Sequence, residues 1–245
     1  MRNIKITIAY DGSRYNGWQR QDHTDNTIQG KLEQLISRMT GEEIEIHGSG
    51  RTDGGVHAHG QVANFHTDCQ MSREEMLAYM NEYLPMDIAV LDIRDAAERF
   101  HSRLNVKRKT YCYHIWNSPI PNVFLRKYSY QIPEPLDLKK MEQAAGYLLG
   151  THDFKSFCSR KKMKKSTVRM IENIQIEKNG SEIILTYRGN GFLYNMVRIL
   201  TGTLIEVGRG ERDAKEIPDI LDAKSRERAG FTAPAQGLFL ERVDY

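Results

Sequence analysis

The residues best suited to chemistry in this chain lie in one glycine-rich stretch, Gly48–Gly60. Its five glycines are incompatible with a regular helix or strand and allow the backbone to approach a ligand closely. Arg51 and Asp53 lie two residues apart within it. A carboxylate can act as a general base or as a covalent nucleophile, and a nearby guanidinium favours the ionised form that a nucleophile needs. The stretch is therefore predicted to be a functional loop. Asp before Gly is also ordinary turn chemistry, and Arg51 could equally hold a phosphate or stack on a base.

Histidines near this loop raise the alternative of a metal site. His57 and His59 would share one face only of an extended segment, and no Cys or carboxylate stands beside them at a familiar ligand spacing. Structural or RNA-contacting histidines are therefore favoured, and no metal is expected. The four histidines of this region are His47, His57, His59 and His66.

The sequence also has no P-loop, no dinucleotide-binding glycine pattern and no GxSxG motif, so no nucleotide cofactor is expected.

Two further sites combine polar chemistry with a regular element. Tyr111 and Tyr113 share one face of a predicted strand that follows a basic cluster, as flipped or single-stranded bases would require. A half-buried strand face would favour tyrosine as well. Arg198 stands among the apolar residues of a predicted helix, so it either snorkels to the surface or pairs with an acid such as Asp53. The basic cluster consists of Arg103, Lys107, Arg108 and Lys109.

Composition and charge narrow the class of protein. The chain has 245 residues, of which 40% are hydrophobic and 27% charged, as in soluble globular proteins of one large or two small domains. It has no apolar run of the ~18 residues that cross a bilayer, and its first residues alternate like a strand, unlike a signal peptide. We therefore expect a cytoplasmic protein with reduced cysteines and no membrane partner. Net charge is +3, but the segment from Arg160 to Arg169 holds six cations and no acid. This run alone favours a solvated face, whereas this run and the basic cluster together leave a polyanionic partner and solvated faces equally open.

The pattern of strands and helices repeats. Each half reads β-α-β-β-α-β. Three of the helices have capping signals at their starts, which are Asn26 or Thr27, Ser72 with Glu75, and Asp137. Asn179-Gly180 marks a hairpin. The first half has expected strands at 4–10, 43–46, 61–67 and 88–93 and helices at 27–40 and 72–84. The second has strands at 109–115, 168–178, 182–188 and 238–243 and helices at 138–149, 192–204 and 213–223.

Two such halves predict an α+β fold. Each half is expected to be a ferredoxin-like unit with helices on one face of its sheet. The two are expected to form a mixed, mostly antiparallel sheet with a central cleft. The expected domains are residues 1–106, which carry the glycine-rich loop, and residues 107–245, which carry the tyrosine strand and Arg198.

The motifs resemble those of the tRNA pseudouridine synthase A family over the whole chain. The glycine-rich loop is similar to the signature loop of that family. Other segments match it in order. The matching segments are Gly50–Ala58, Phe100–Arg103, Lys109–Tyr113, His152–Phe154 with Phe157, Phe192–Arg198 and Gly237–Leu240.

The resemblance implies a pseudouridine synthase fold and a cofactor-free isomerase. The family converts uridine to pseudouridine at positions 38 to 40 of the tRNA anticodon stem-loop, and it acts as a homodimer on a flipped-out base. By this resemblance Asp53 is the catalytic nucleophile, and Tyr111 stacks on the target base. Arg51 helps to extrude that base, Arg198 pairs with the catalytic carboxylate, and Leu238 contacts the uracil. Basic segments would bind tRNA phosphates.

One residue departs from the family pattern. Gly54 follows Asp53 where alanine or another non-glycine residue is expected, and it should loosen the loop. Two other readings stay open at this point. The chain could be a non-catalytic RNA-binding protein with the same fold, or a metal-dependent hydrolase that uses the histidines.

Overall fold

The computed structural model describes residues 1–161 and 165–245, which fall into two compact units. The first comprises Met1–Lys107 together with Phe239–Tyr245, and the second comprises Arg108–Leu238. The expected division between residues 106 and 107 lies beside the first of these boundaries. The last strand, which was assigned to residues 107–245, groups with the first unit instead.

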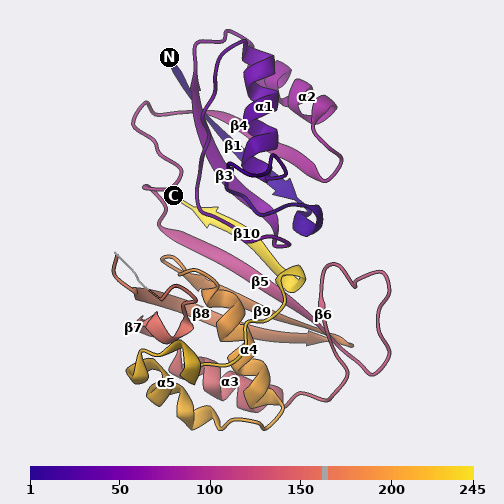
Figure 1. Cartoon of the computed structure of the whole chain (residues 1–245), viewed down its shortest axis with the longest axis vertical. Coiled ribbons are helices and arrows are strands. Elements are labelled where there is room, and N and C mark those ends of the chain that lie inside the picture. Colours follow the sequence, from indigo (N-terminus) through magenta and orange to yellow (C-terminus); the bar gives the residue numbers. More distant parts are fainter. Residues whose placement is uncertain (162–164) are drawn as a thin grey trace. The chain divides into compact units, whose positions relative to one another are not determined.

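The first unit has the β-α-β-β-α-β order expected for its half of the chain. Strands β4, β1 and β3 are antiparallel neighbours, and β2 and β10 both pair with β3, β10 in parallel. Figure 1 shows α1 and α2 together on one side of these strands. The elements are β1 (Arg2–Tyr10), α1 (Ile28–Thr40), β2 (His47–Gly48), β3 (His57–Thr67), α2 (Arg73–Tyr83), β4 (Ile88–Ala96) and most of β10 (Leu238–Asp244).

The helices of this unit begin where their caps were predicted. Thr27 rather than Asn26 caps α1, and its hydroxyl accepts a hydrogen bond from Gly30 N. Ser72 and Glu75 form the capping box that opens α2. Gly41 ends α1 in the left-handed conformation with φ of 74°. Apolar side chains of β1 and α1, including Ile6 and Leu32, are fully buried and form the core of the unit.

Two predictions around the glycine-rich loop are wrong. The strand expected at 43–46 is instead the two-residue β2, His47–Gly48. Strand β3 begins at His57, so the last four residues of the loop are regular strand despite Gly60. Pairing explains this, because His57 and Ala58 pair with β10 and Ala58 with β1. A Cβ on Gly60 would lie 2.6 Å from the backbone oxygen of Glu241, so glycine is needed for this close approach.

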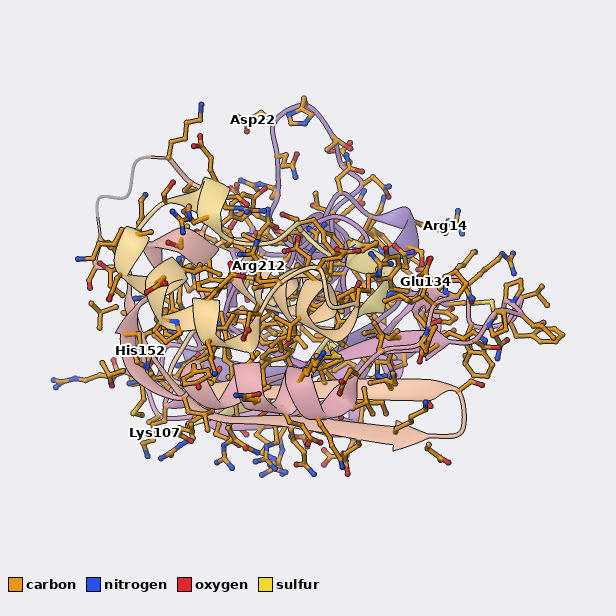
Figure 2. All side chains as sticks on the ribbon, turned by 90° about the horizontal axis from the view of Figure 1, so that it is seen from below. Arg14, Asp22, Lys107, Glu134, His152 and Arg212 are labelled. Carbon is orange, nitrogen blue, oxygen red and sulfur yellow. The ribbon has the colours of Figure 1, made fainter. Side chains whose placement is uncertain are left out.

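The second unit places its helices on one side of a sheet as well. Strands β5, β9, β8 and β7 are antiparallel neighbours in that order, and β6 adds to β5 in parallel. Figure 1 shows α3, α4 and α5 gathered on one side, and Figure 2 shows side chains projecting from the opposite face of these strands. The elements are β5 (Arg108–Asn117), β6 (Tyr130–Ile132), α3 (Leu138–Tyr147), β7 (Gly150–Asp153), β8 (Val168–Asn179), β9 (Glu182–Gly189), α4 (Met196–Gly208) and α5 (Ile217–Ala223).

Predictions for this unit were partly right. Asp137 caps α3, and the Asn179-Gly180 turn joins β8 to β9 as expected. Helix α4 begins at Met196, so Phe192 does not belong to its face. Strands β6 and β7 were not predicted. Taken together, the mixed and mostly antiparallel pairing confirms the predicted α+β class. Within the described residues, every helix is too short or too polar to cross a membrane.

Candidate active site

The glycine-rich loop is fixed at its entry by β3. Ser49 N donates to Val62 O at 2.7 Å, and the Ser49 hydroxyl donates to Gln61 Oε1 at 2.6 Å. The amide of Gln61 in turn donates to Gly50 O at 3.0 Å. Ser49 and Gln61 are both buried, so these bonds form away from water, where they restrain geometry most strongly. The loop is therefore a rigid connection up to the residue before Arg51.

Thr52 anchors the middle of the loop against the segment after β1. Its carbonyl accepts from Trp18 N at 3.0 Å, and its hydroxyl lies 2.8 Å from the buried Tyr10 hydroxyl. Gly17 has φ of 94°, and a Cβ on it would lie 2.6 Å from Thr52 O. The two segments thus touch through their backbones, which leaves the residue after Thr52 little freedom.

Asp53 begins a tight turn. Val56 N donates to Asp53 O at 3.1 Å, and Gly55 has φ of 79°, as the third residue of a type II turn does. The Asp53 side chain is half-buried. Gly54 adopts no positive φ, and a Cβ on it would meet Tyr15 O at an ordinary 3.4 Å. Alanine, one of the non-glycine residues expected at position 54, would therefore fit this turn without strain.

Arg51 lies exposed beside the anchored part of the loop. Its Nε donates to Gln19 Oε1 at 3.0 Å. Gln19 belongs to the segment that also carries Trp18, so one stretch of chain supports the loop backbone and contacts the Arg51 side chain. This arrangement restrains the Arg51 side chain through its Nε.

The histidines of the loop have structural contacts. His57 is 1% exposed, its Nδ1 lies 3.1 Å from both Gly12 N and an Asp11 carboxylate oxygen, and its ring stacks on Phe239 at 4.6 Å. His59 is exposed and its Nδ1 lies 2.8 Å from Glu241 Oε2. In the part of the chain that the structure describes, no three His, Cys, Asp or Glu side chains gather as a metal site would require.

Tyr111 lies on the helix-covered face of β5 in the second unit. It is 8% exposed, and its ring makes a T-shaped contact with the ring of Phe192, with 5.3 Å between the ring centres and 85° between the planes. Tyr113, on the same face, is fully buried, and its hydroxyl donates to Pro234 O at 2.8 Å. Burial raises the pKa of Tyr113, so this hydroxyl remains a donor. Tyr111 is thus held by an aromatic neighbour, whereas Tyr113 belongs to the core.

Arg198 lies in the first turn of α4. Its Nε donates to Ala233 O at 2.7 Å, and its Nη1 donates to Asn195 Oδ1 at 3.1 Å. Asn195 has a backbone φ of 60°, which is uncommon for residues other than glycine. Its side-chain amide donates to Ser159 Oγ at 3.0 Å. The backbone strain at Asn195 therefore coincides with its hold on Arg198. No role was predicted for Asn195, although it lies within the matching segment Phe192–Arg198 and within the helix expected at 192–204.

Leu238 begins β10 and is buried. The chain before it is held at two points, since Ala233 O accepts from Arg198 and Pro234 O accepts from Tyr113. A Cβ on Gly237 would lie 2.7 Å from the Tyr113 ring. Leu238 is therefore placed by contacts that also orient Arg198.

The basic clusters differ in their surroundings. Arg108 is paired with Glu172, with 2.6 Å between Nε and Oε1, so it is partly neutralised. The Arg160 guanidinium lies over the exposed Tyr194 ring at 5.5 Å from its centre. Residues 162–164 of the predicted Arg160–Arg169 segment lie outside the described residues.

The predicted site residues thus fall into two groups. Arg51 and Asp53 share one loop of the first unit, and Tyr111, Arg198 and Leu238 belong to the second unit. Their catalytic and binding roles stay predictions.

Comparison with known proteins identifies the family. The family model described as tRNA pseudouridine synthase matches residues 6–104 and 144–245. These ranges contain the loop with Asp53, as well as Arg198 and Leu238, and Tyr111 falls between them.

Full-length relatives agree with this match. The chain is 48% identical to "tRNA pseudouridine synthase A 2" of Bacillus cereus (strain ZK / E33L) and 49% identical to "tRNA pseudouridine synthase A 1" of Clostridium tetani, over 100% of both chains in each case. A chain of the archaeal box H/ACA sRNP Nop10–Cbf5 crystal structure is 11% identical with a TM-score of 0.38, covering 82% of this chain and 43% of that one, too weak a likeness for any conclusion. The chain therefore belongs to the tRNA pseudouridine synthase A family of enzymes.

Proposed function

We propose that this enzyme converts uridine to pseudouridine at positions 38 to 40 of the tRNA anticodon stem-loop, with Asp53 as the nucleophile. The observation that carries the proposal is the full-length identity of 48% to a tRNA pseudouridine synthase A. The structure of the loop supports the proposed role of Asp53, because hydrogen bonds hold the turn on both sides of this residue. A nucleophile held in this way loses little freedom when substrate binds.

The reaction rearranges bonds within one nucleotide. The N-glycosidic bond between N1 and C1′ breaks, the uracil turns, and C5 bonds to C1′. The C5 proton leaves to solvent and N1 takes up a proton from solvent, so the composition of the nucleotide is unchanged. Nothing is oxidised or reduced and no group is transferred to a second molecule. The chemistry can therefore be carried by side chains alone, and we propose that no cofactor takes part.

The other site residues have roles set by the need to expose the base. An enzyme that acts on a base in a folded RNA must first take it out of the stack. We propose that Arg51 occupies the space that the base vacates and that Tyr111 stacks on the extruded uracil, with Leu238 in apolar contact. Arg198, oriented by Ala233 and Asn195, pairs with the Asp53 carboxylate in the working enzyme and keeps it ionised.

The partners follow from the substrate. The exposed Arg160 and its neighbours supply phosphate contacts to tRNA, which makes binding salt-dependent. We further propose that the enzyme acts as a homodimer in the cytoplasm, as the family resemblance implies.

A transcript with tritium at uracil C5 tests the proposal. The unmodified tRNA carries labelled uridines, and pseudouridine formation releases the C5 tritium to water. Release is expected without added metal or nucleotide. A matched transcript in which cytidine replaces uridine at positions 38, 39 and 40 should release none. Equal release from both transcripts would contradict the assigned positions, and no release from either would contradict the activity.

A further inference from the structure

A series of hydrogen bonds between side chains connects Arg51 to the buried side of α1. Arg51 Nε donates to Gln19 Oε1 at 3.0 Å, and Gln19 Nε2 donates to Gln29 Oε1 at 2.8 Å. Gln29 Nε2 then donates to Glu33 Oε1 at 2.7 Å. Gln29 and Glu33 belong to α1 and are 6% and 5% exposed, whereas Arg51 is exposed. This series of hydrogen bonds therefore runs from the protein interior to the loop that carries Asp53.

Several further hydrogen bonds hold the buried end of this series, at Glu33 and Gln29. Glu33 Oε1 also accepts from Ile46 N at 3.0 Å, and its Oε2 lies 3.1 Å from Arg20 Nη1. Gln29 Oε1 accepts from Arg20 N at 3.1 Å as well as from Gln19. A buried carboxylate needs such partners, and once they are in place it has one available geometry.

The two ends dictate which way each amide points. A carboxylate only accepts hydrogen bonds, so Gln29 must turn its NH₂ toward Glu33 and its oxygen toward Gln19. Gln19 must then donate to that oxygen and present its own oxygen outward. A guanidinium only donates, so this outward oxygen suits Arg51 and would repel a carboxylate placed there. The direction of the amides thus follows from chemistry at both ends.

We infer that Gln19 is a positioning residue for Arg51, oriented by the buried Glu33 through Gln29. The inference rests on the proposed function, in which Arg51 replaces the extruded base. An exposed arginine has many rotamers, and holding its Nε in place lowers the entropy lost when the guanidinium enters the RNA. Gln19 therefore acts only through Arg51, and it contributes to the step after tRNA binding in which the guanidinium enters the RNA.

A double-mutant cycle between Gln19 and Arg51 tests this. Gln19→Met keeps the length of the side chain and removes both of its hydrogen bonds. Gln19→Met is expected to lower the single-turnover rate of tritium release at saturating tRNA roughly tenfold, the loss of one hydrogen bond to a charged group, with little change in tRNA affinity. In the Arg51→Met background, Gln19→Met should have no further effect.

Controls separate positioning from folding. Gln21→Met alters the same segment, where the Gln21 amide donates to Asn16 O at 3.0 Å, and it should leave the rate unchanged. Thermal unfolding of each variant reports any loss of stability. A general structural role for Gln19 would slow both Arg51 backgrounds equally and would overturn the inference.

The outcomes distinguish the inference from the proposed function. If Arg51→Met slows release and Gln19→Met does not, the inference fails and the proposed function stands. If Arg51→Met leaves the rate unchanged, the proposed role of Arg51 fails and the inference falls with it. If the unaltered enzyme releases no tritium, the proposed function itself is wrong.

Discussion

The hydroxyl of Tyr10 lies 2.8 Å from the hydroxyl of Thr52, inside the first unit and one residue before Asp53. Tyr10 is 5% exposed, and burial raises the pKa of its hydroxyl, which therefore stays protonated. This bond ties the end of β1 to the loop that carries the proposed nucleophile. The stability of the unit and the placement of Asp53 are consequently linked.

Tyr10→Phe is expected to lower the free energy of unfolding by about 1–2 kcal/mol, because it removes a buried partner of the Thr52 hydroxyl. Adding Thr52→Val removes the other hydroxyl and should recover part of this loss. Urea unfolding of the two single variants and the double variant measures the coupling. Strictly additive losses would show that the two hydroxyls do not interact.

Gly48 is expected to tolerate no side chain. A Cβ there would lie 2.5 Å from the ring of Trp18, which is 2% exposed and has no room to move. Gly48→Ala should therefore destabilise the protein by about 1–3 kcal/mol, the usual cost of overpacking. Gly146 in α3 meets nothing within 4 Å, and Gly146→Ala should instead stabilise by about 0.5–1 kcal/mol. Thermal unfolding should separate the two, and equal shifts would refute the argument from packing.

Tyr111 is expected to act through its ring. Base stacking on an aromatic side chain is worth ~1–3 kcal/mol. Tyr111→Leu should therefore reduce single-turnover pseudouridine formation by roughly ten- to a hundredfold, whereas Tyr111→Phe keeps the ring and most of the rate. Tyr111→Leu also removes the ring contact with Phe192, so the unfolding of the two variants should be compared. A Tyr111→Leu enzyme with normal turnover would exclude the stacking role.

His101 makes stability depend on pH. Burial, followed by the charge of neighbouring His47, lowers the pKa of His101 below its usual value of 6.5, and its neutral Nδ1 accepts a hydrogen bond from Arg103 N at 3.1 Å. The unfolded chain therefore binds more protons at this residue than the folded protein as pH falls below about 6.5, so stability is lost through that window. His101→Gln should flatten this part of the pH profile, measured by urea unfolding. Parallel profiles for His101→Gln and the unaltered protein would contradict this origin.

Local signals predicted the elements that depend on local chemistry. Helices α1, α2 and α3 begin at the predicted caps, which are Thr27, Ser72 with Glu75, and Asp137. The predicted Asn179-Gly180 turn connects β8 to β9. These features need only neighbours in sequence, so a single chain reveals them.

Features set by distant contacts could not be predicted. The short β6 and β7 exist because β5 and β8 offer them edges, and His57 becomes strand through pairing with Phe239. Phe192 matches the helical period of α4 and yet precedes it, since Asn195 adopts a left-handed conformation. At the site, the types and spacing of Arg51 and Asp53 make them candidates from sequence alone. The residue types of Gln19 and Asn195 set neither of them apart, because neutral amides are common throughout the chain. Their importance lies in geometry that only the fold supplies.

The most direct test of the account compares Asp53→Asn with the unaltered enzyme on tRNA labelled with tritium at uracil C5. Asparagine keeps the size of the side chain and removes the nucleophilic carboxylate. Asp22→Asn makes the same change on an exposed loop, labelled in Figure 2, and serves as the control. We expect full release by the unaltered enzyme and by Asp22→Asn, and no release by Asp53→Asn with tRNA affinity retained. Normal turnover by Asp53→Asn would contradict the assignment of Asp53 as the nucleophile.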